Sequence, residues 1–444
     1  MSGRKWLYDL PHFMLGMLLI FFLAQHAPNL EYDIDPSYIM FGQARPPLYP
    51  LFIWLFHWAG PYQFYIIMWL QGALLFTALM YARFWLKKNL QLTEFLIFLI
   101  SAIVLVTISF HFQIWHIQSE GLAFPFFIFT LFLLIECFQA YNLKKLCYLA
   151  GMVSLLVLTR LQFYYFYGIF AILLAWYVWQ RTPVKSLVAT ALILFGSMSL
   201  TTITDHTYHY FKHGIYFSGS YAGLMILVQA LYLADDNAAD YLNNQTEKDY
   251  VKNMIIQRNA QGLNQDAALI NTLKPSYFEY AYQAYSRNYL ALQRIIDETL
   301  KTSVENTFGN VPISEANATA LSIDKVLISH AIKKNLTFLI WKFVKCMGGI
   351  PLFLFFSIFL FMLPFKIIKN KIRYPDVAAV FVGVVTIITF FNAAIIAMCN
   401  PDLPVYFCYS QFMFYCLAAL LVNISFQRDA HYVKGSFDQS FLSR

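Results

Sequence analysis

The sequence predicts an all-α polytopic membrane protein with about ten transmembrane helices and an extracytoplasmic helical insertion. Of its 444 residues, 59% are apolar and only 12% are charged, and the mean hydropathy is +0.54. A soluble domain carries about a quarter charged residues. The charges leave apolar stretches of about 20 residues, long enough to cross a bilayer as helices. This pattern excludes a soluble enzyme, a nucleic-acid-binding module and a transmembrane barrel.

Ten apolar runs define the expected helices. They lie at about residues 12–28, 61–82, 95–115, 120–138, 146–159, 161–180, 186–204, 346–365, 377–398 and 403–425. The runs divide the chain into three parts. Residues 1–204 form an N-terminal transmembrane module of about seven spans, residues 205–345 an inserted domain, and residues 346–444 a C-terminal module of about three spans with a cytoplasmic tail.

The distribution of Lys and Arg orients the chain, because short cytoplasmic loops collect basic residues. With a cytoplasmic N-terminus, sixteen basic residues fall in inner loops and tails, and only Arg45 and Arg160 fall in short outer loops. The inner set is Arg4, Lys5, Arg83, Lys87, Lys88, Lys144, Lys145, Arg181, Lys185, Lys366, Lys369, Lys371, Arg373, Arg428, Lys434 and Arg444. Both termini are therefore expected in the cytoplasm, and the net charge of +7 needs no nucleic-acid partner.

The segment 205–345 is expected outside and differs from the rest of the chain in composition. It holds 13 acidic and 13 basic residues in stretches typical of polar helices. Within it, one set of residues recurs at helical spacing and predicts a packed face. These residues are Tyr282, Tyr285, Tyr289, Leu292 and Ile296. We expect a small extracytoplasmic helical domain.

The six cysteines show no paired metal-binding spacing, and the sequence has no zinc motif, Walker loop or G-x-S-x-G elbow. An ATP-driven pump is therefore disfavoured. Cys399 and Cys408 flank the last outer loop and are close enough in sequence to pair, although nothing in the sequence requires it. No cofactor is indicated, and whether the protein uses a divalent cation is left open.

Acidic residues gather at the outer membrane face in the loop after the first span. Charge near the hydrocarbon core costs about 2.5 to 3.5 kcal/mol, so such a cluster needs a reason. Glu31, Asp33 and Asp35 are followed by Arg45 and a Pro-Pro turn. A carboxylate can accept a proton from a hydroxyl or bind a divalent cation, and an arginine can hold a phosphate. These groups are the components of sugar transfer from a lipid phosphate.

Further polar residues are expected at the same face. Glu120, His111 and His116 lie in HFQIWHIQSEGLAF, where the third span ends and the fourth begins. Arg160 lies between two apolar runs and is costly to hold without a phosphate or carboxylate partner. Asp205, at the end of the seventh run, is placed to frame the same outer cavity.

Structural roles are alternatives for several of these residues. Asp35 precedes a proline, as an N-cap residue often does. Arg45 has the reach to anchor in lipid headgroups, and the charge of Glu120 suits a helix N-terminus. A histidine such as His116 is more often a residue of the membrane interface than a metal ligand or a catalytic base.

Three stretches resemble one superfamily. In ARPPLYPLFIWLFHWAGPYQFYIIMWL, a basic residue and Pro-Pro-Leu precede a short amphipathic helix, a glycine and the second span. This order is similar to that in protein O-mannosyltransferases and bacterial aminoarabinose transferases, members of the GT-C superfamily of membrane glycosyltransferases. The stretches IQSEGLAFPFFIFTLFLL and VLTRLQF are similar to the second outer loop and the Arg-bearing fifth span of these enzymes. The likeness covers about the first 205 residues.

The resemblance implies a catalytic base and a donor. In the superfamily, an Asp a few residues before a Tyr in the first outer loop is the base, and the donor is a polyprenyl or dolichyl phosphate sugar. Here Asp35 and Asp33 precede Tyr38. Both are candidate bases, and Asp35 is favoured.

Members of the superfamily often carry Arg-Tyr before the last span, where this chain has Val405 and Tyr406. Binding of the donor phosphate is therefore expected from Arg45 and Arg160. The resemblance implies a mannosyltransferase-like enzyme of the cell envelope that transfers a hexose or pentose to a lipid, glycan or protein acceptor. A bacterial inner membrane is favoured over the endoplasmic reticulum, with the active site on the periplasmic or lumenal side and membrane lipids around the spans.

Two other functions are alternatives to a glycosyltransferase. A transporter or flippase of lipid-linked saccharides is expected to carry charges at mid-membrane depth and repeated halves with broken helices. A polysaccharide polymerase or ligase is expected to place several arginines in its outer loops. The sequence shows neither pattern, and both remain alternatives.

Overall fold

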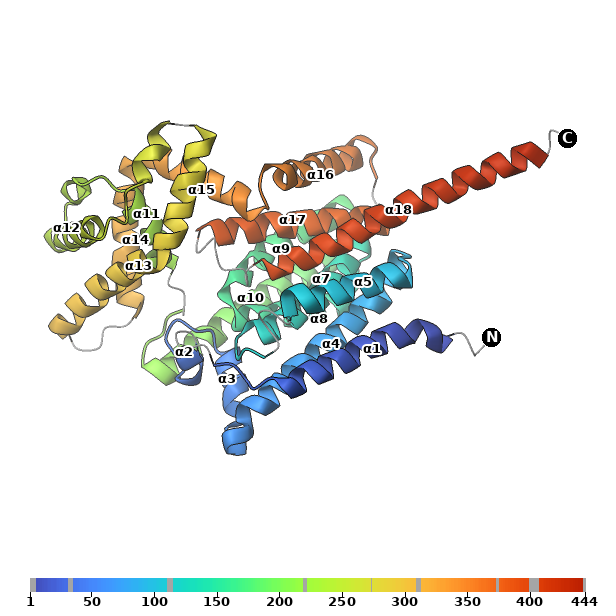
Figure 1. Ribbon diagram of the computed structural model, residues 1–444, viewed down its shortest axis with the longest axis horizontal. Helices are drawn as coiled ribbons and strands as arrows, with labels where there is room; N and C mark the ends of the chain where they lie inside the picture. The colour runs from blue at the N-terminus through green and yellow to red at the C-terminus, as the bar shows by residue number, and fades with distance from the viewer. Residues whose placement is uncertain are drawn as a thin grey trace.

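The computed structural model shows an elongated chain built of helices (Figure 1). It describes residues 5–30, 35–109, 115–218, 222–272, 274–308, 313–372, 375–398 and 407–441. Within these ranges every named element is a helix, and the β-type pairing is an isolated bridge between Asn29 and His116. The predicted all-α class is confirmed.

Seven helices of the described chain are long and apolar enough to cross a membrane. They are His57–Asn89, Glu120–Gln139, Leu161–Trp179, Val184–His213, Ile350–Lys369, Val377–Met398 and Cys408–Phe426. The other three expected spans fall on α1 (Lys5–Gln25), α5 (Glu94–Val104) and α8 (Leu143–Thr159), whose apolar stretches are shorter. The chain is a multi-pass membrane protein, and the count of ten spans stays a prediction.

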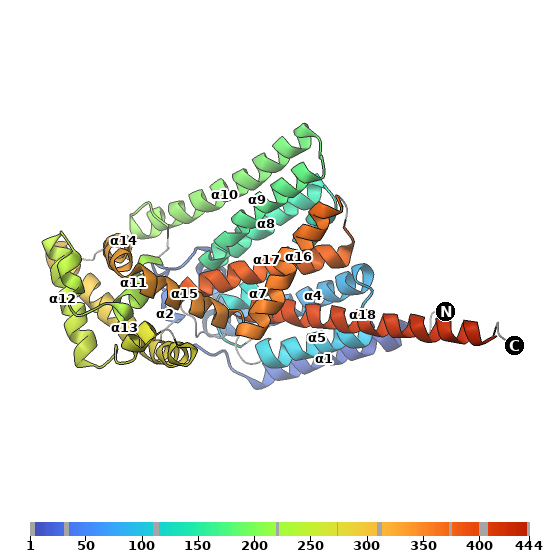
Figure 2. The ribbon, with the colours of Figure 1, turned by 90° about the horizontal axis from the view of Figure 1, so that it is seen from above.

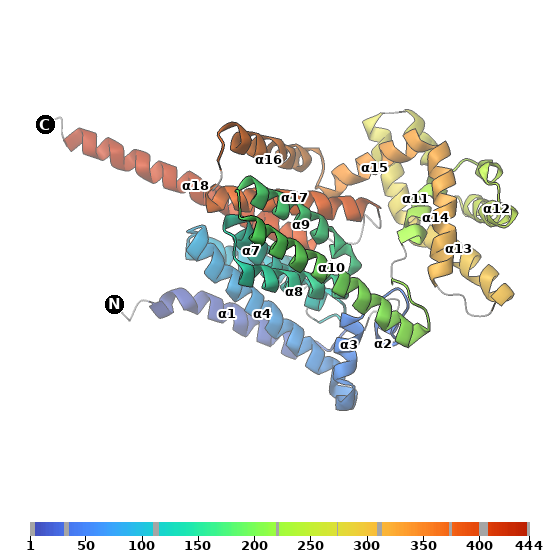
Figure 3. The same cartoon turned by 180° about the vertical axis from the view of Figure 1, so that it is seen from behind.

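The main bundle surrounds α7 (Glu120–Gln139), which is the most buried of the candidate spans. It packs against α4 (Gln63–Asn89), α8 and α17 (Val377–Met398), and its Phe124, Phe127 and Phe132 are fully buried. The remaining members of the bundle are α9 (Tyr165–Trp179), α10 (Val184–His213), α16 (Ile350–Lys369) and α18 (Cys408–Phe441). Figure 3 shows α16 at the edge, beside α17.

A second apolar core lies at one end of the bundle, and the two chain termini lie at the other (Figures 1 and 2). Its helices are α11 (Ala222–Leu233), α12 (Gln245–Ala260), α13 (Pro275–Phe308), α14 (Ile313–His330) and α15 (Ile332–Cys346), with the 3-10 turns η4 (Ala238–Tyr241) and η5 (Ala267–Thr272). The predicted face of α13 is confirmed, since Tyr285, Tyr289, Leu292 and Ile296 are buried and Tyr282 is half-buried.

Helix α10 continues past residue 205, the expected start of the inserted domain. It ends at His213, where Gly214 adopts a φ of 74°. A glycine takes this left-handed conformation at little cost and so terminates the helix. The first helix of the second core is α11, and the exact domain boundaries stay a prediction.

A buried arginine secures α12 to the end of α11. Arg258 is 0% exposed and donates to the main-chain oxygens of Leu231 and Ala234 at 2.7 and 2.6 Å. These carbonyls lie at a helix C-terminus, where the helix itself supplies no donor. Arg258 also pairs with Asp236 at 2.9 Å. Burial lowers the pKa of Arg258, an effect that the nearby carboxylates oppose.

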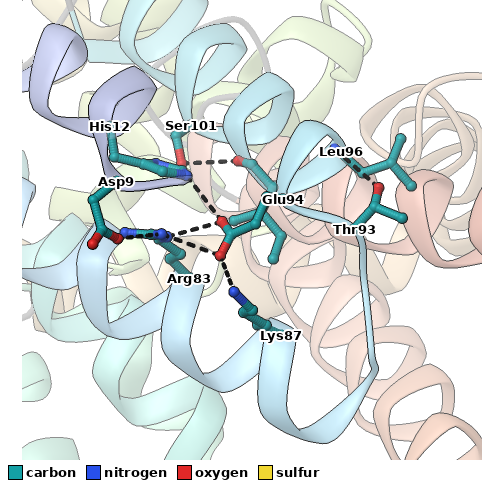
Figure 4. Close-up of polar contacts among 9 residues, drawn as sticks. Asp9, His12, Arg83, Lys87, Thr93, Glu94, Leu96 and Ser101 are labelled. Atoms are coloured by element: carbon teal, nitrogen blue, oxygen red, sulfur yellow. Dashed lines mark hydrogen bonds and ion pairs between the residues drawn. The ribbon is translucent and has the colours of Figure 1, made fainter. Parts of the chain in front are cut away.

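An ion-pair cluster joins α1, α4 and α5 at the end of the bundle that carries the termini (Figure 4). Arg83 donates to Glu94 at 3.0 and 3.1 Å and to Asp9 at 2.7 Å. Glu94 also contacts Lys87 and lies 3.3 Å from the ring of His12. Because every charge drawn has an opposite partner, the cluster fixes the helices without leaving Arg83 buried alone. Helix α5 then continues into a π-helical turn, η2 (Leu105–Ser109).

Candidate active site

The outer end of the bundle is defined as the end that carries α2 (Asp35–Ile39), α3 (Leu48–Leu55) and the inserted domain. The chain enters α4 there through α3 and the 3-10 turn η1 (His57–Tyr62). In this segment Tyr49 and Ile53 are buried, whereas Trp54, Trp58 and Tyr62 are exposed. Exposed Trp and Tyr side chains are typical of a membrane–water interface. The segment therefore fits the amphipathic helix predicted before the second span.

The turn between α2 and α3 folds back onto α2. The amide of Gly42 donates to the carbonyl of Ser37 at 2.6 Å, and that of Arg45 donates to Gly42 at 3.0 Å. A Cβ at Gly42 would lie 2.9 Å from the oxygen of Ser37, so the turn requires glycine. Phe41 has a φ of 56°, a left-handed conformation uncommon outside glycine. The folded turn directs Arg45 onto α2.

Arg45 contacts two side chains of α2. Its Nε donates to Ser37 Oγ at 2.8 Å, and its Nη1 donates to the hydroxyl of Tyr38 at 3.2 Å. The guanidinium carbon lies 4.4 Å from the centre of the Tyr38 ring. These contacts hold the cation by hydrogen bonds and a cation–π interaction. The partners are neutral, so they leave the positive charge in place.

Arg160 lies where α8 ends and the 3-10 turn η3 (Leu161–Tyr164) begins. Its extended backbone, with a φ of −150°, breaks the helix and lets the side chain reach the start of α7. There it forms an ion pair with Glu120 and donates to Ser119 Oγ at 3.2 Å. The side chains of Arg160 and Glu120 are 12% and 5% exposed. The predicted carboxylate partner of Arg160 is therefore Glu120.

Ser119 joins the two arginines into one network. Its hydroxyl lies 2.9 Å from the hydroxyl of Tyr38, which also accepts from Arg45. Ser119 was not among the predicted site residues, although it stands directly before Glu120. Four of the predicted residues, Tyr38, Arg45, Glu120 and Arg160, are thus brought together through one serine that is fully buried.

A cavity of about 340 Å³ lies beside this network. Its polar lining comes from Tyr38, Arg45, Arg160 and Gln162, and its apolar lining includes residues of α11 and α17. The lining consists of Tyr38, Ala44, Arg45, Pro46, Thr159, Arg160, Leu161, Gln162, Tyr164, Ala222, Met225, Ile395 and Ile396. Its volume lies in the range of about 300 to 1,000 Å³ typical of small-molecule sites. No feature of the sequence indicated the contribution of α11.

The charges around the cavity do not cancel within the described residues. Glu120 neutralises Arg160, whereas the partners described for Arg45 are the neutral Ser37 and Tyr38. The described part of the site therefore carries about one net positive charge. A single negative group, held by a charge-assisted hydrogen bond to a guanidinium, matches this balance.

Four predicted residues cannot be placed fully. Asp33 and Tyr406 lie outside the described residues, as does His111. Asp35 begins α2, one helical turn before Tyr38, but its side chain is outside the described part. The backbone thus puts Asp35 close in the chain to a residue that lines the cavity, and the role of both Asp residues stays a prediction.

His116 is not among the residues lining the cavity, and its contacts hold the segment before α7 in place. Its backbone pairs with that of Asn29, and its Nδ1 lies 3.4 Å from the Asn29 amide nitrogen. Its carbonyl accepts from Gln71 Nε2 at 3.1 Å, and Gln71 accepts from Tyr49 at 2.9 Å. These contacts anchor the segment before α7 to α4. The structural alternative considered for His116 fits this position.

Asp205 is buried on α10 and is likewise not among the residues lining the cavity. Its Oδ1 lies 3.6 Å from His209 Nε2, one helical turn further on. The same end of α10 packs against the α2–α3 turn, where Lys212 Nζ lies 3.9 Å from the Phe41 ring centre and Tyr208 lies 6.4 Å from it. Asp205 thus lies on the helix end that contacts the turn, and its expected place at the outer cavity stays a prediction.

The part of the chain that the structure describes shows no metal ligand set, and the comparisons identify no family. Among the described residues, no three His, Cys, Asp or Glu side chains are grouped as a metal site would require. Cys399 is outside the described residues, so its pairing with Cys408 stays a prediction. Comparisons with models of protein families, with curated proteins and with solved structures found no match.

Proposed function

We propose that the protein is a glycosyltransferase that moves a sugar from a polyprenyl-phosphate donor to an acceptor at the outer end of the bundle. One observation carries this proposal. Arg45 and Arg160, the two basic residues of the short outer loops, come from separate loops and line one cavity. A convergence of costly charges at one membrane face is expected for a site that binds an anionic ligand.

The polar and the apolar residues that line the cavity suit the two parts of such a donor. Arg45 and Tyr38 offer a cation and a hydroxyl to a phosphate, and a guanidinium can hold two phosphate oxygens at once. Met225, Ile395 and Ile396 offer an apolar surface to the first units of a prenyl chain. The charge balance, with Arg160 neutralised by Glu120, favours a donor with one phosphate over a diphosphate.

The proposed reaction is a direct displacement at the anomeric carbon. The acceptor hydroxyl gives its proton to a carboxylate, Asp35 or alternatively Asp33, and its oxygen forms the new bond to the sugar. The bond from the anomeric carbon to the phosphate oxygen breaks, and the polyprenyl phosphate leaves with the electron pair. Arg45 stabilises the charge on this leaving phosphate, while Glu120 holds Arg160 in position.

Binding of the leaving group tests the proposal without knowledge of the sugar. The probe is decaprenyl phosphate, titrated into the purified full-length protein in detergent. We expect saturable binding that weakens about 10-fold or more in Arg45→Ala and less in Arg45→Lys, since Lys keeps the charge but not the two-pronged geometry. Lys88→Gln, which removes a charge from the opposite end of the bundle, is the control. Unchanged binding of decaprenyl phosphate by Arg45→Ala would contradict the proposal that Arg45 binds the phosphate.

Transfer and transport are separated by a second measurement. Proteoliposomes are supplied with a panel of radiolabelled polyprenyl monophosphate sugars and with envelope extracts as acceptors. A glycosyltransferase releases polyprenyl phosphate and labels an acceptor, whereas a flippase moves intact donor between leaflets. Donor movement without release of polyprenyl phosphate would contradict the proposal and favour the transporter.

A further inference from the structure

A second cavity, also of about 340 Å³, is separate from the first. Helix α17 contributes to both, with Ile396 at the first cavity and Val380 at the second. The nearest lining residues of the two cavities on this helix, Ile387 and Ile395, are eight residues apart, about 12 Å along the axis, and the second cavity extends from there to Ala379 near the start of α17. The second cavity therefore belongs to the opposite end of the bundle, and we call it the α9–α16–α17 groove.

The groove has an apolar lining. Trp176 and Trp179 come from α9, Leu363 and Ile367 from α16, and Val380 and Gly383 from α17. The indole nitrogens of the two tryptophans are occupied by the carbonyls of Phe138 and Ile372, at 2.8 and 3.2 Å. Their rings therefore present apolar faces, and the groove offers little to a polar ligand.

Helix α16 makes the groove open to the bilayer. Only 6% of its apolar window is buried, by far the smallest share among the candidate spans. Phe361, Met362 and Phe365 are exposed on it. In Figure 3, α16 lies at the edge of the bundle next to α17. A hydrocarbon chain can therefore reach the groove sideways from the membrane.

Basic residues border the groove at the loops that join its helices. Lys366 and Lys369 occupy the last turn of α16, and Lys371 follows it. Arg181 follows α9, and Lys185 lies in the first turn of α10. All five are exposed, and none forms an ion pair within the described residues.

Two of these cations occupy positions that normally favour glycine. Arg181 and Lys371 have φ values of 59° and 52° and close the ends of α9 and α16. Their neighbours complete the same capping pattern, since Thr182 donates to Tyr177 at 3.0 Å and Ile372 donates to Ile367 at 2.9 Å. A basic side chain thus stands at both turns where a glycine would be conformationally easier.

We propose that the α9–α16–α17 groove is a binding site for an anionic phospholipid of the adjacent leaflet. An acyl chain lies between α9, α16 and α17, and the phosphate-bearing headgroup contacts Arg181, Lys369 and Lys371. Apolar contact alone would accept any lipid, whereas these cations, which form no ion pair among the described residues, select a headgroup with net negative charge. This inference is independent of the glycosyltransferase proposal.

The test counts lipids retained by the purified full-length protein in native mass spectrometry. The probes are phosphatidylglycerol and phosphatidylcholine with identical chains, supplied at equal concentration. We expect the protein to retain one molecule of phosphatidylglycerol. The amount of bound phosphatidylglycerol should be at least five times that of bound phosphatidylcholine. The preference disappears in the Arg181→Gln/Lys371→Gln variant and persists in Lys88→Gln, which removes an exposed charge at the end of α4.

Substitutions that fill the groove test whether the acyl chain of the lipid lies in it. Ala175→Phe on α9 and Gly383→Leu on α17 both narrow it, from opposite sides, and both should reduce retention of phosphatidylglycerol at least fivefold. Two variants are used so that the test remains valid if one of them fails to fold. Equal retention of the two lipids by the wild type, or unchanged retention in both filled variants, overturns the proposal. Displacement of phosphatidylglycerol by decaprenyl phosphate also overturns it, because the groove would then hold a prenyl lipid.

Discussion

Asp324 on α14 lies in the apolar core of the inserted domain. It is 4% exposed and shares a helix face with the buried Ala320, Ile323 and Leu327. Neither of its carboxylate oxygens has a hydrogen-bond partner among the described residues. Burial raises the pKa of Asp324 from 3.8 to about 8, because the charged form loses its hydration and gains no compensating contact.

The raised pKa makes the stability of the domain depend on pH. The folded protein keeps Asp324 protonated up to about pH 8, whereas the unfolded chain releases the proton near 3.8. Between these values the unfolded state binds fewer protons, so the free energy of unfolding falls by about 1.4 kcal/mol per pH unit as the pH rises. From pH 5.5 to 7.5 the loss is about 3 kcal/mol. Above about pH 8 both states are ionised and the loss levels off.

Asp324→Leu removes this titration and fills a similar volume with apolar atoms. We expect the wild type to unfold roughly 6 to 12 °C lower at pH 7.5 than at 5.5, taking 2 to 4 °C per kcal/mol. The contribution of Asp324 is the difference between this change in unfolding temperature in the wild type and the corresponding change in Asp324→Leu. Asp324→Asn should also lack it, but should be less stable than the Leu variant by about 1 to 3 kcal/mol, because the amide is buried without partners. Thermal unfolding of the detergent-purified protein, followed by tryptophan fluorescence, provides the measurement.

Glu279 provides a control in the same domain. A hydrogen bond from Lys345 lowers the pKa of Glu279 below its usual 4.5. Its stabilising contribution is therefore complete above pH 4.5 and is lost on acidification, outside the window of the experiment. Glu279→Gln should keep the wild-type shift between pH 5.5 and 7.5. An Asp324→Leu variant with that same shift, or one less stable than the wild type at pH 7.5, would refute the reasoning.

Three other predictions concern the site, the bundle and the topology. Asp35→Asn should lower sugar transfer by about 10²-fold or more and leave binding of decaprenyl phosphate unchanged; wild-type turnover would remove Asp35 as the base. Glu94→Gln strips a buried arginine of its main partner and should lower the free energy of unfolding by about 3 to 5 kcal/mol. Asp9→Asn, at a carboxylate 66% exposed, should cost less than about 1 kcal/mol in the same unfolding assay. A cysteine introduced at Asn244 should react with an impermeant thiol reagent from outside, and one at Lys369 should not; the reverse pattern would invert the predicted orientation.

Much of the helical architecture was predictable because a membrane helix is a local feature. A run of apolar residues must satisfy its own backbone hydrogen bonds in lipid, so its length and composition predict a spanning helix. Seven such helices appear at the expected places, and the spaced aromatic face of α13 is buried as predicted. Helix α10 runs nine residues past the apolar run 186–204, because its last turns, through His213, are polar yet remain helical and pack against the α2–α3 turn.

The candidate site was predictable residue by residue but not as an assembly. Arg45, Glu120 and Arg160 stood out because charges are rare at that face. The contacts among these residues could not be predicted from the sequence, since the link through Ser119 depends on a turn at Gly42 and a helix break at Arg160.

The sequence alone determined that this chain is a helical membrane protein with its unusual charges at the faces of the bundle. Hydropathy and charge act over one helix length, so they can be read along the chain. Only the tertiary structure decided that Arg160 is neutralised by Glu120, that Arg45 lies beside a cavity with neutral partners among the described residues, and that Asp324 is buried with no described hydrogen-bond partner. Each of these depends on contacts between segments far apart in the chain, and burial and charge pairing exist only once those segments have packed.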